Sequence, residues 1–447
     1  MNIAEINATF VFQLKKIFRI VRMKKVLIVN YYWPPAGGPG VQRWLKFVKY
    51  LPDFGVEPHV YVPENPNYPI VDETLAIETS PAINIIKQPI FEPYALGKLI
   101  SKKKTNRISS GIITEKNPSW MEKFLLFVRG NFFVPDARVF WVKPSVRFLK
   151  KYLQENQIDT LITTGPPHSL HLIGLKLKKE LDIRWIADFR DPWTTISYHN
   201  KLRMLKFVQK KHLRMEQDVL QKANEIIVTS RTLQQAYQKM TKKPVSLITN
   251  GYDQSDFEIC PLDTSFSITH IGSMLSGRNP VVLWEALKEL VKEQPEFKKQ
   301  LKIRLVGIVG QNVIKALSEI GLMPFVQQLG YVSHEEAVRL QHSAQLLLLA
   351  EIDSADTKVI IPGKFFEYLS AKRPILAIGP NDWEINELIE QTSSGRCFHH
   401  QQQKEIKDYI WECFQAFQSG NLTVQSKGIE TFSRKELTQK LAEIIYR

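Results

Sequence analysis

Two kinds of hydrophobic pattern alternate along most of this chain. Short runs rich in apolar and β-branched residues, such as residues 26–30, 160–164 and 345–350, are typical of buried parallel strands. Each run leads into a polar or glycine-containing turn and then into a segment with apolar residues three and four positions apart. The alternation breaks at residues 258–266 and resumes at residue 267. It therefore predicts an α/β protein with two doubly wound domains that face a cleft.

The same pattern sets the domain boundaries that we expect. An extension at residues 1–22 precedes an N-terminal domain at 23–258 and a C-terminal domain at 259–425, and a helix at 426–447 packs back toward the N-terminal domain. The extension is a basic amphipathic helix that contacts a membrane or, alternatively, lies ahead of a functional protein that starts at Met23. Its apolar face would hold Phe10, Leu14, Ile17 and Val21.

Charge changes this picture by indicating anionic partners. The 447 residues include 60 Lys and Arg against 45 Asp and Glu, a net charge of +15, which favours nucleotides, nucleic acid or an anionic membrane. Cations and aromatic residues are interleaved in residues 98–151. This basic stretch is either a patch that contacts an anionic bilayer or a solvated insertion. No nucleic-acid-binding module is recognisable, so we do not expect a nucleic-acid partner.

The cysteines and the hydropathy indicate a cytoplasmic protein. Cys260, Cys397 and Cys413 are few and widely spaced, which argues against a disulfide framework and against a zinc site. We find no apolar run long enough to span a membrane and no secretory signal at the N-terminus. The expected location is the cytoplasm, with peripheral contact to the inner face of the plasma membrane as an open alternative.

Loops after the predicted strands of the first domain hold candidate site residues. Ligands of open α/β sheets bind at the carboxyl ends of the strands. Gly37 and Gly38 follow the first strand, without the spacing of a dinucleotide fingerprint or a P-loop. His168 follows the strand at 160–164. Three charged residues of a further loop either line the same edge or form an internal ion-pair cluster: Asp188, Arg190 and Asp191.

The stretch at residues 360–378 is the most suggestive part of the second domain. Its pattern predicts a loop, a short helix that begins near Gly363, and a buried strand. Lys364 and Glu367 are three residues apart and share a face near the helix N-terminus, which attracts phosphate. The pair could hold a diphosphate and a sugar or ribose hydroxyl pair, or it could be an ordinary surface ion pair.

In order and spacing, several segments resemble the retaining glycosyltransferases of GT-B fold, family 4. The likeness extends over nearly the whole chain from Met23, with features of a bacterial subgroup that assembles surface polysaccharides. It implies two Rossmann-like domains. The segments are residues 37–38, 164–169, 187–193, 248–253, 270–272, 329–332 and 364–369.

The resemblance also implies roles for individual residues. Arg278 matches a basic residue that contacts the donor diphosphate, and Lys364 is a second candidate for that contact. Glu367 matches the second glutamate of the family's E-x7-E motif, which binds ribose hydroxyls, and His168 matches a histidine near the reacting sugar carbon. We therefore expect His168 and Glu367 to be catalytic. The other expected donor-binding residues are Gly37, Gly38, Gly272, Ser273 and Tyr331, and the acceptor-side candidates are Arg43, Asp188, Arg190 and Asp191.

Two positions depart from the family pattern. Val359 stands where the first glutamate of the motif is expected, and Ser273 replaces the usual arginine after the glycine. Lys364 could compensate for that missing cation. We find no Asp-x-Asp motif in a suitable loop, so we expect no essential metal and no cofactor.

The function implied is transfer of a sugar, with retention, from a nucleotide sugar to a glycan or lipid-linked acceptor in cell-surface polysaccharide biosynthesis. Two alternatives stay open. One is a nucleotide-sugar epimerase of similar fold, and the other is a catalytically degenerate sugar-binding or scaffold protein.

Overall fold

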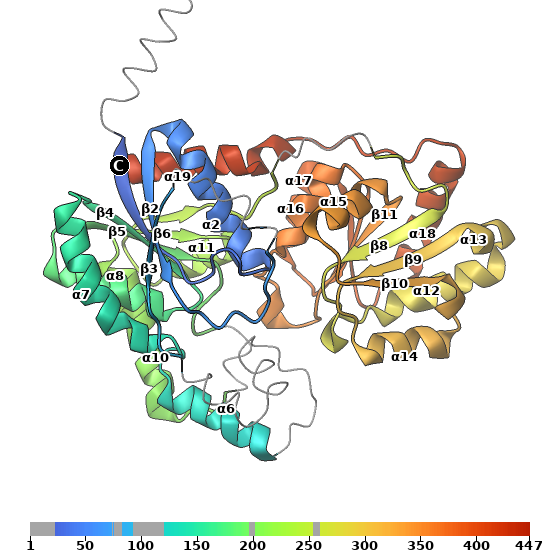
Figure 1. Ribbon diagram of the computed structural model, residues 1–447. Coiled ribbons are helices and arrows are strands. Elements are labelled where there is room, and N and C mark those ends of the chain that lie inside the picture. The colour runs from blue at the N-terminus through green and yellow to red at the C-terminus, as the bar shows by residue number, and fades with distance from the viewer. Residues whose placement is uncertain (1–22, 74, 76–82, 93–119, 196–201, 254–259) are drawn as a thin grey trace, which may run out of the picture.

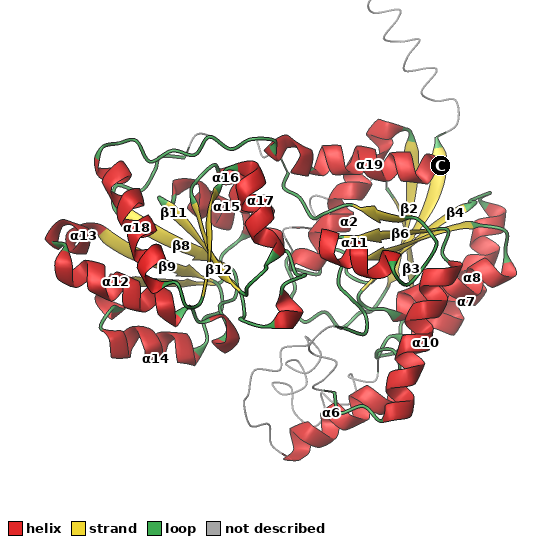
Figure 2. Ribbon diagram, turned by 180° about the vertical axis from the view of Figure 1, so that it is seen from behind, coloured by secondary structure: helices red, strands yellow, loops and turns green. Residues whose placement is uncertain are grey.

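The computed structural model describes residues 23–73, 75, 83–92, 120–195, 202–253 and 260–447. Two α/β domains lie side by side (Figure 1), and the view from behind in Figure 2 shows helices around each sheet. The expectations for residues 1–22 and for 98–119 lie outside the described residues. Each described sheet contains parallel strands only. The prediction of two doubly wound, Rossmann-like domains is therefore confirmed.

The N-terminal sheet has the strand order β3-β2-β1-β4-β5-β6-β7. The direction of winding changes between β1 and β4, so the loops that follow these two strands flank a topological switch point. The strands are β1 (Lys24–Val29), β2 (Val56–Pro63), β3 (Asn84–Gln88), β4 (Thr160–Gly165), β5 (Arg184–Phe189), β6 (Glu225–Val228) and β7 (Val245–Leu247).

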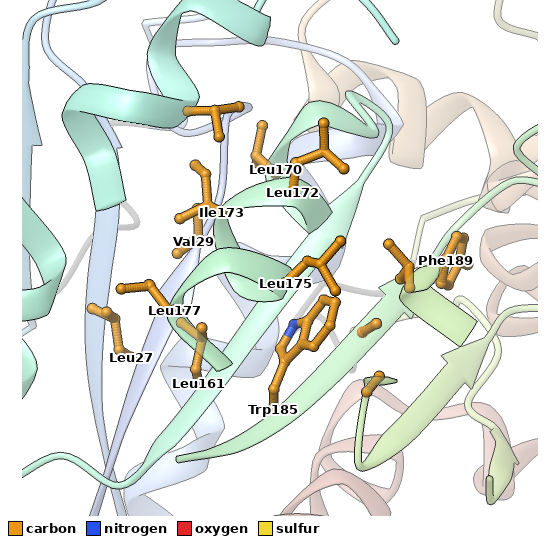
Figure 3. Close-up of a cluster of buried hydrophobic side chains, with 14 of the residues drawn as sticks. Leu27, Val29, Leu161, Leu170, Leu172, Ile173, Leu175, Leu177, Trp185 and Phe189 are labelled. Atoms are coloured by element: carbon orange, nitrogen blue, oxygen red, sulfur yellow. The ribbon is translucent and has the colours of Figure 1, made fainter. Parts of the chain in front are cut away.

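Helices cover both faces of this sheet, which explains why its strands are apolar on successive residues. Leu27 and Val29 point to one face and belong to one core with α7 and α8, whereas Val26 and Ile28 face α2 and α19. Figure 3 shows the first of these cores, where Leu27, Val29 and Leu161 lie close to apolar side chains of α8. The helices are α2 (Pro39–Tyr50), η1 (Leu51–Phe54), α6 (Trp120–Phe132), α7 (Val139–Glu155), α8 (Ser169–Glu180), α10 (Lys206–Lys222), α11 (Arg231–Gln238) and, from the end of the chain, α19 (Arg434–Tyr446).

The C-terminal sheet has the order β10-β9-β8-β11-β12-β13, with its switch point between β8 and β11. Its strands are β8 (Phe266–Ile271), β9 (Leu301–Val306), β10 (Val326–Gly330), β11 (Leu346–Ala350), β12 (Ile375–Gly379) and β13 (Gly395–His399). The helices of this half are η2 (Ser276–Arg278), α12 (Val281–Glu293), α13 (Pro295–Gln300), α14 (Gln311–Ile320), η3 (Met323–Phe325), α15 (His334–Ser343), η4 (Ala355–Thr357), α16 (Gly363–Ala371), α17 (Glu384–Thr392), α18 (Gln403–Gln418) and η5 (Ile429–Phe432).

The chain returns to the N-terminal domain at its end. Leu437 and Leu441 of α19 are buried in the same core as Val26 and Trp44. On the way back the chain runs beside Tyr252, whose N–H donates to the Phe432 carbonyl (3.1 Å) and whose carbonyl accepts from the Arg434 N–H (2.8 Å). The last helix is thus part of the first domain's core.

A second contact joins the domains through one carboxylate. Glu384, at the start of α17, accepts hydrogen bonds from the Arg231 N–H (2.6 Å) and from the Thr232 N–H (2.9 Å) and hydroxyl (2.7 Å). These donors are at the N-terminus of α11, where the helix dipole favours an anion. Among the described residues, no helix is long and apolar enough to cross a bilayer.

Candidate functional site

The carboxyl ends of the strands at the two switch points carry most of the expected site residues. In the C-terminal domain, Gly272 and Ser273 follow β8, and α16 begins with Gly363 and Lys364. In the N-terminal domain, Gly37 and Gly38 lie between β1 and α2, and His168 lies between β4 and α8. The topology thus assigns one group of candidates to each sheet.

Lys364 is held at the C-terminal switch point by a histidine and not by a carboxylate. Its Nζ donates to His270 Nε2 at 3.3 Å, while His270 Nδ1 donates to the Leu348 carbonyl at 3.0 Å. Because the carbonyl accepts only and the ammonium donates only, both contacts require the neutral Nδ1–H tautomer. Burial, and then the charge of Lys364, hold the pKa of His270 well below its usual value, which keeps the ring neutral.

The surroundings of Lys364 make its charge costly. Burial is the largest cause that lowers its pKa from 10.5 to about 8, and repulsion by Arg278 adds to it, against attraction by Glu351 and Glu367. No ion pair of Lys364 is found within the described residues. An anion bound beside Nζ would offset this cost, so the geometry suits a ligand with negative charge.

Gly272 provides the space for that amine. Its φ is +99°, a conformation that favours glycine, and a Cβ atom there would lie 3.0 Å from Lys364 Nζ. A side chain at this position would therefore have to displace the amine.

Arg278 stands near Lys364 and is paired with a residue that the sequence interpretation missed. Its Nε and Nη2 donate to the two carboxylate oxygens of Glu351 at 2.8 and 3.1 Å. Glu351 is buried, whereas a third of the Arg278 side chain is exposed. The Glu351 carboxylate thus orients a guanidinium whose Nη1 has no partner within the described residues. Glu351 follows the apolar run of β11 directly, a position that could have drawn attention to it.

Glu367 and Tyr331 complete the C-terminal group. Glu367 lies one turn after Lys364 on α16, is partly exposed, and accepts a hydrogen bond from Gln341 Nε2 at 3.2 Å. Tyr331 follows β10 and is 65% exposed, with its hydroxyl 3.5 Å from an oxygen of Asp72 in the other domain. Val359 and Ser273 are both partly exposed, Val359 in the turn before α16 and Ser273 directly after Gly272.

In the N-terminal domain, Arg43 and Asp188 form an internal ion pair. Arg43 is 1% exposed and donates to Asp188 and to the carbonyls of Ile248 and Thr249 at 2.8–2.9 Å. Asp188 also accepts from Trp44 Nε1 (2.9 Å) and Thr164 Oγ1 (2.8 Å). Burial raises the pKa of Asp188, but Arg43 and these hydrogen bonds together lower it. Both side chains therefore fit the internal-cluster alternative and not an acceptor contact.

Arg190 and Asp191 lie at the same edge with different roles. Arg190 donates to the Gly40 carbonyl (2.8 Å) and to the Pro166 carbonyl, so it ties the first turn of α2 to the loop after β4. Asp191 is partly exposed and makes no hydrogen bond within the described residues. Burial raises the pKa of its carboxyl, against attraction by Arg190. Among the acceptor-side candidates, Asp191 is thus the one whose carboxylate, apart from its attraction to Arg190, has no hydrogen-bond partner within the described residues.

His168 is placed differently from the expectation of a sugar contact. Its ring is 4% exposed and stacks on Trp193, with ring centroids 4.8 Å apart and an interplanar angle of 4°. In this arrangement it is a packed part of the loop after β4.

The glycine loop after β1 is fitted closely to its neighbours. The Gly37 N–H donates to the Ile70 carbonyl at 3.0 Å, and a Cβ atom at Gly37 would lie 2.8 Å from the Ile70 side chain. Gly38 has a φ of +93° and precedes α2. This loop lies against the segment that contains Asp72, which meets Tyr331 of the other domain.

Comparison with known proteins agrees with this architecture. Residues 114–256 match the family model described as Glycosyltransferase Family 4. No match was found among curated protein sequences.

Solved structures of similar fold cover nearly the whole chain. A glycosyltransferase from Rickettsia africae has 15% identity and a TM-score of 0.59 over 95% of this chain and 98% of its own. The Anabaena protein HepE, solved with UDP-glucose, has 14% identity and a TM-score of 0.58 over 94% and 99%. A putative UDP-N-acetylglucosamine 2-epimerase from Listeria monocytogenes has 10% identity and a TM-score of 0.54 over 95% and 96%. At these identities the likeness shows the fold alone. The chain therefore has the GT-B fold, and its residues 114–256 carry the similarity to glycosyltransferase family 4 that the sequence motifs had indicated.

Proposed function

We propose that this protein transfers a sugar, with retention, from a nucleotide-sugar donor to a glycan or lipid-linked acceptor in cell-surface polysaccharide biosynthesis. The observation that carries the proposal is the pair of cations at the C-terminal switch point, Lys364 and Arg278. Each keeps hydrogen-bond donors with no partner among the described residues, and each is oriented by a buried neighbour, His270 or Glu351. The match to the family model and the complex of HepE with UDP-glucose support the assignment.

The chemistry follows from where charge develops. When the bond between the sugar and the diphosphate breaks, negative charge grows on the leaving diphosphate. Lys364 Nζ, Arg278 Nη1 and the first N–H groups of α16 would stabilise that charge without having to reorganise. Glu367 would accept hydrogen bonds from the ribose hydroxyls, because its carboxylate has acceptor capacity beyond the single bond from Gln341.

The proposal differs from the initial expectation in the first domain. Arg43 and Asp188 take no direct part, since their polar atoms are occupied inside the protein. Asp191 is the residue of this edge to which we assign an acceptor contact. We assign His168 a structural role: its ring packs on Trp193 and so helps to fix the conformation of the loop after β4.

The first experiment is a thermal-shift screen of the full-length protein with nucleotide sugars and free nucleoside diphosphates. A donor at 100 times its Kd should stabilise the protein by about 2.7 kcal/mol. If no nucleotide raises the melting temperature, the assignment of the donor site is wrong, and the result favours the alternative of a scaffold protein.

Turnover assays separate the remaining alternatives. Release of nucleoside diphosphate that depends on a glycan acceptor supports transfer, whereas interconversion of sugar isomers without any acceptor supports an epimerase. NMR of the product's anomeric proton reports retention or inversion. Activity that survives a chelator would agree with the expected independence from metal, and activity lost with a chelator and restored by a divalent cation would contradict it.

A further inference from the structure

In the part of the chain that the structure describes, the exposed Phe and Trp side chains gather in one place. Among the described residues, every exposed Phe and Trp lies on α6, on α10 or at the adjoining positions 91 and 140: Phe91, Trp120, Phe124, Phe132, Phe140 and Phe207. Their exposed fractions run from 47% for Phe140 to 76% for Trp120. Such a concentration of large apolar groups marks an interaction surface.

Helix α6 is bonded to the residues that lead directly into α10, so the exposed faces of the two helices form one surface. The Leu205 N–H donates to Asn131 Oδ1 at 2.8 Å, and Asn131 Nδ2 donates to the Arg203 carbonyl at 3.3 Å. A Cβ atom at Gly130 would lie 2.5 Å from the Leu202 carbonyl oxygen, so glycine permits this close approach. In Figures 1 and 2 both views place α6 and α10 together at the lower end of the N-terminal domain.

Each helix presents a suitable outer face. On α6, Trp120, Phe124 and Phe132 are separated by multiples of four residues and so share one side, while Leu126 and Gly130 are buried on another. Phe140, in the first turn of α7, connects this stripe to Phe91 and Phe133 through ring contacts of 5.8 and 6.0 Å.

The outer face of α10 is basic as well as aromatic. Lys210, Lys211 and Arg214 lie three, four and seven residues after Phe207 and therefore on its side of the helix. Together with Arg203 and Lys206 they are exposed, and none of the five makes an ion pair within the described residues. We call these cations and the six aromatic residues the α6–α10 surface.

The combination of aromatic and basic residues indicates which kind of partner binds the α6–α10 surface. Protein interfaces are depleted in Lys, especially at their apolar centre. Exposed Phe and Trp with several Lys and Arg beside them suit the interface of an anionic bilayer, where rings enter the headgroup region and cations meet lipid phosphates. We propose that the α6–α10 surface docks this protein on an anionic lipid bilayer. The proposal does not depend on the sugar-transfer activity.

The test is cosedimentation of the full-length protein with vesicles of phosphatidylcholine alone and with phosphatidylglycerol added. We expect binding to the anionic vesicles, at least 10-fold weaker binding to the neutral ones, and a further loss at high salt. Changing Lys206, Lys210 and Lys211 to Gln should weaken anionic binding at least 10-fold. The matched control changes Lys292, Lys298 and Lys302 of the C-terminal domain to Gln and should bind as the unchanged protein does.

Insertion of the rings is tested separately. Phe124→Ser with Phe207→Ser should weaken vesicle binding at least 5-fold at unchanged net charge. Quenching of tryptophan fluorescence by brominated lipids should fall in Trp120→Phe, and circular dichroism checks that each variant is folded. Failure of the unchanged protein to bind anionic vesicles, or equal losses in the two lysine variants, would overturn the proposal. Self-association through this surface without vesicle binding would assign it to a protein contact instead.

Discussion

The two sheet edges use their cations in opposite ways. At the N-terminal edge, Arg43 donates four hydrogen bonds to Asp188 and two backbone carbonyls, all inside the protein. At the C-terminal edge, Lys364 is half-buried and faces a neutral histidine, and Arg278 has used only part of its donors. The comparison teaches that an enclosed cation indicates a ligand site when its own fold leaves its charge or its donors unsatisfied, and a structural pair when the fold satisfies both.

The largest effect should come from breaking the balanced pair. Arg43→Met leaves the Asp188 carboxylate buried without its counter-charge, which should cost about 3–5 kcal/mol of unfolding free energy. Lys364→Met removes a cation that burial disfavours, so it should be neutral or stabilising. Urea denaturation of both variants measures the contrast. Similar losses of stability in the two variants would contradict the distinction between a balanced cation at the N-terminal edge and an unbalanced one at the C-terminal edge.

A second effect should appear in turnover and not in stability. Loss of the Arg278 contact to the leaving diphosphate should reduce kcat/KM at least about 10-fold, since a charged hydrogen bond contributes about 1.5–3 kcal/mol. Arg278→Ala alone would strand the buried Glu351 carboxylate. Arg278→Met combined with Glu351→Gln avoids that penalty, and a melting temperature near the unchanged value shows that the fold is kept. Full activity in this double variant would exclude Arg278 from the donor site.

The smallest effect is a pH dependence that should have opposite signs for binding and for stability. Because the pKa of Lys364 is about 8, donor affinity should fall about 10-fold from pH 7 to pH 9 as the amine loses its proton. The unfolded chain retains that proton up to pH 10.5, so the contribution of this group to the stability of the free protein should rise between pH 8 and 10.5.

Calorimetric titration and denaturation across this range check both signs. The groups that act on Lys364 are Arg278, Glu351, Glu367 and the neutral His270. Lys364→Arg should bind the donor with little change between pH 7 and 9. The same slope in this variant would assign the titration to another group.

Local patterns in the sequence were sufficient for the fold but not for all of its strands. The central strands were predicted because both of their faces are buried, which makes them continuously apolar. The edge strands β3 and β13 have residues that are largely exposed or half-buried and carry no such run, so this pattern does not reveal them. The helices α6 and α7 were treated as a basic stretch, since their cations obscured the helical spacing of the buried residues.

For the candidate site, too, the sequence indicates some features and not others. The positions of Lys364, Glu367 and Gly272 at the edge of the second sheet could be predicted, because these residues lie within a few residues of a strand end or helix start. The pairing of Arg43 with Asp188 joins residues 145 positions apart, and that of Arg278 with Glu351 joins residues 73 positions apart. Which partner balances a charge is decided by packing between distant segments, so local spacing could not distinguish the internal pair from an exposed acceptor contact.

The return of the chain to the N-terminal domain has a mechanical consequence. The chain passes between the domains twice, and the passages meet at Tyr252 and Ser433, where backbone hydrogen bonds join them. Gly251 lets them touch, because a Cβ atom there would lie 2.3 Å from the Phe432 carbonyl oxygen. Two bonded connections can bend together, but twisting would pull one past the other. A twist of one domain against the other would therefore strain these hydrogen bonds, whereas bending both connections together would keep them.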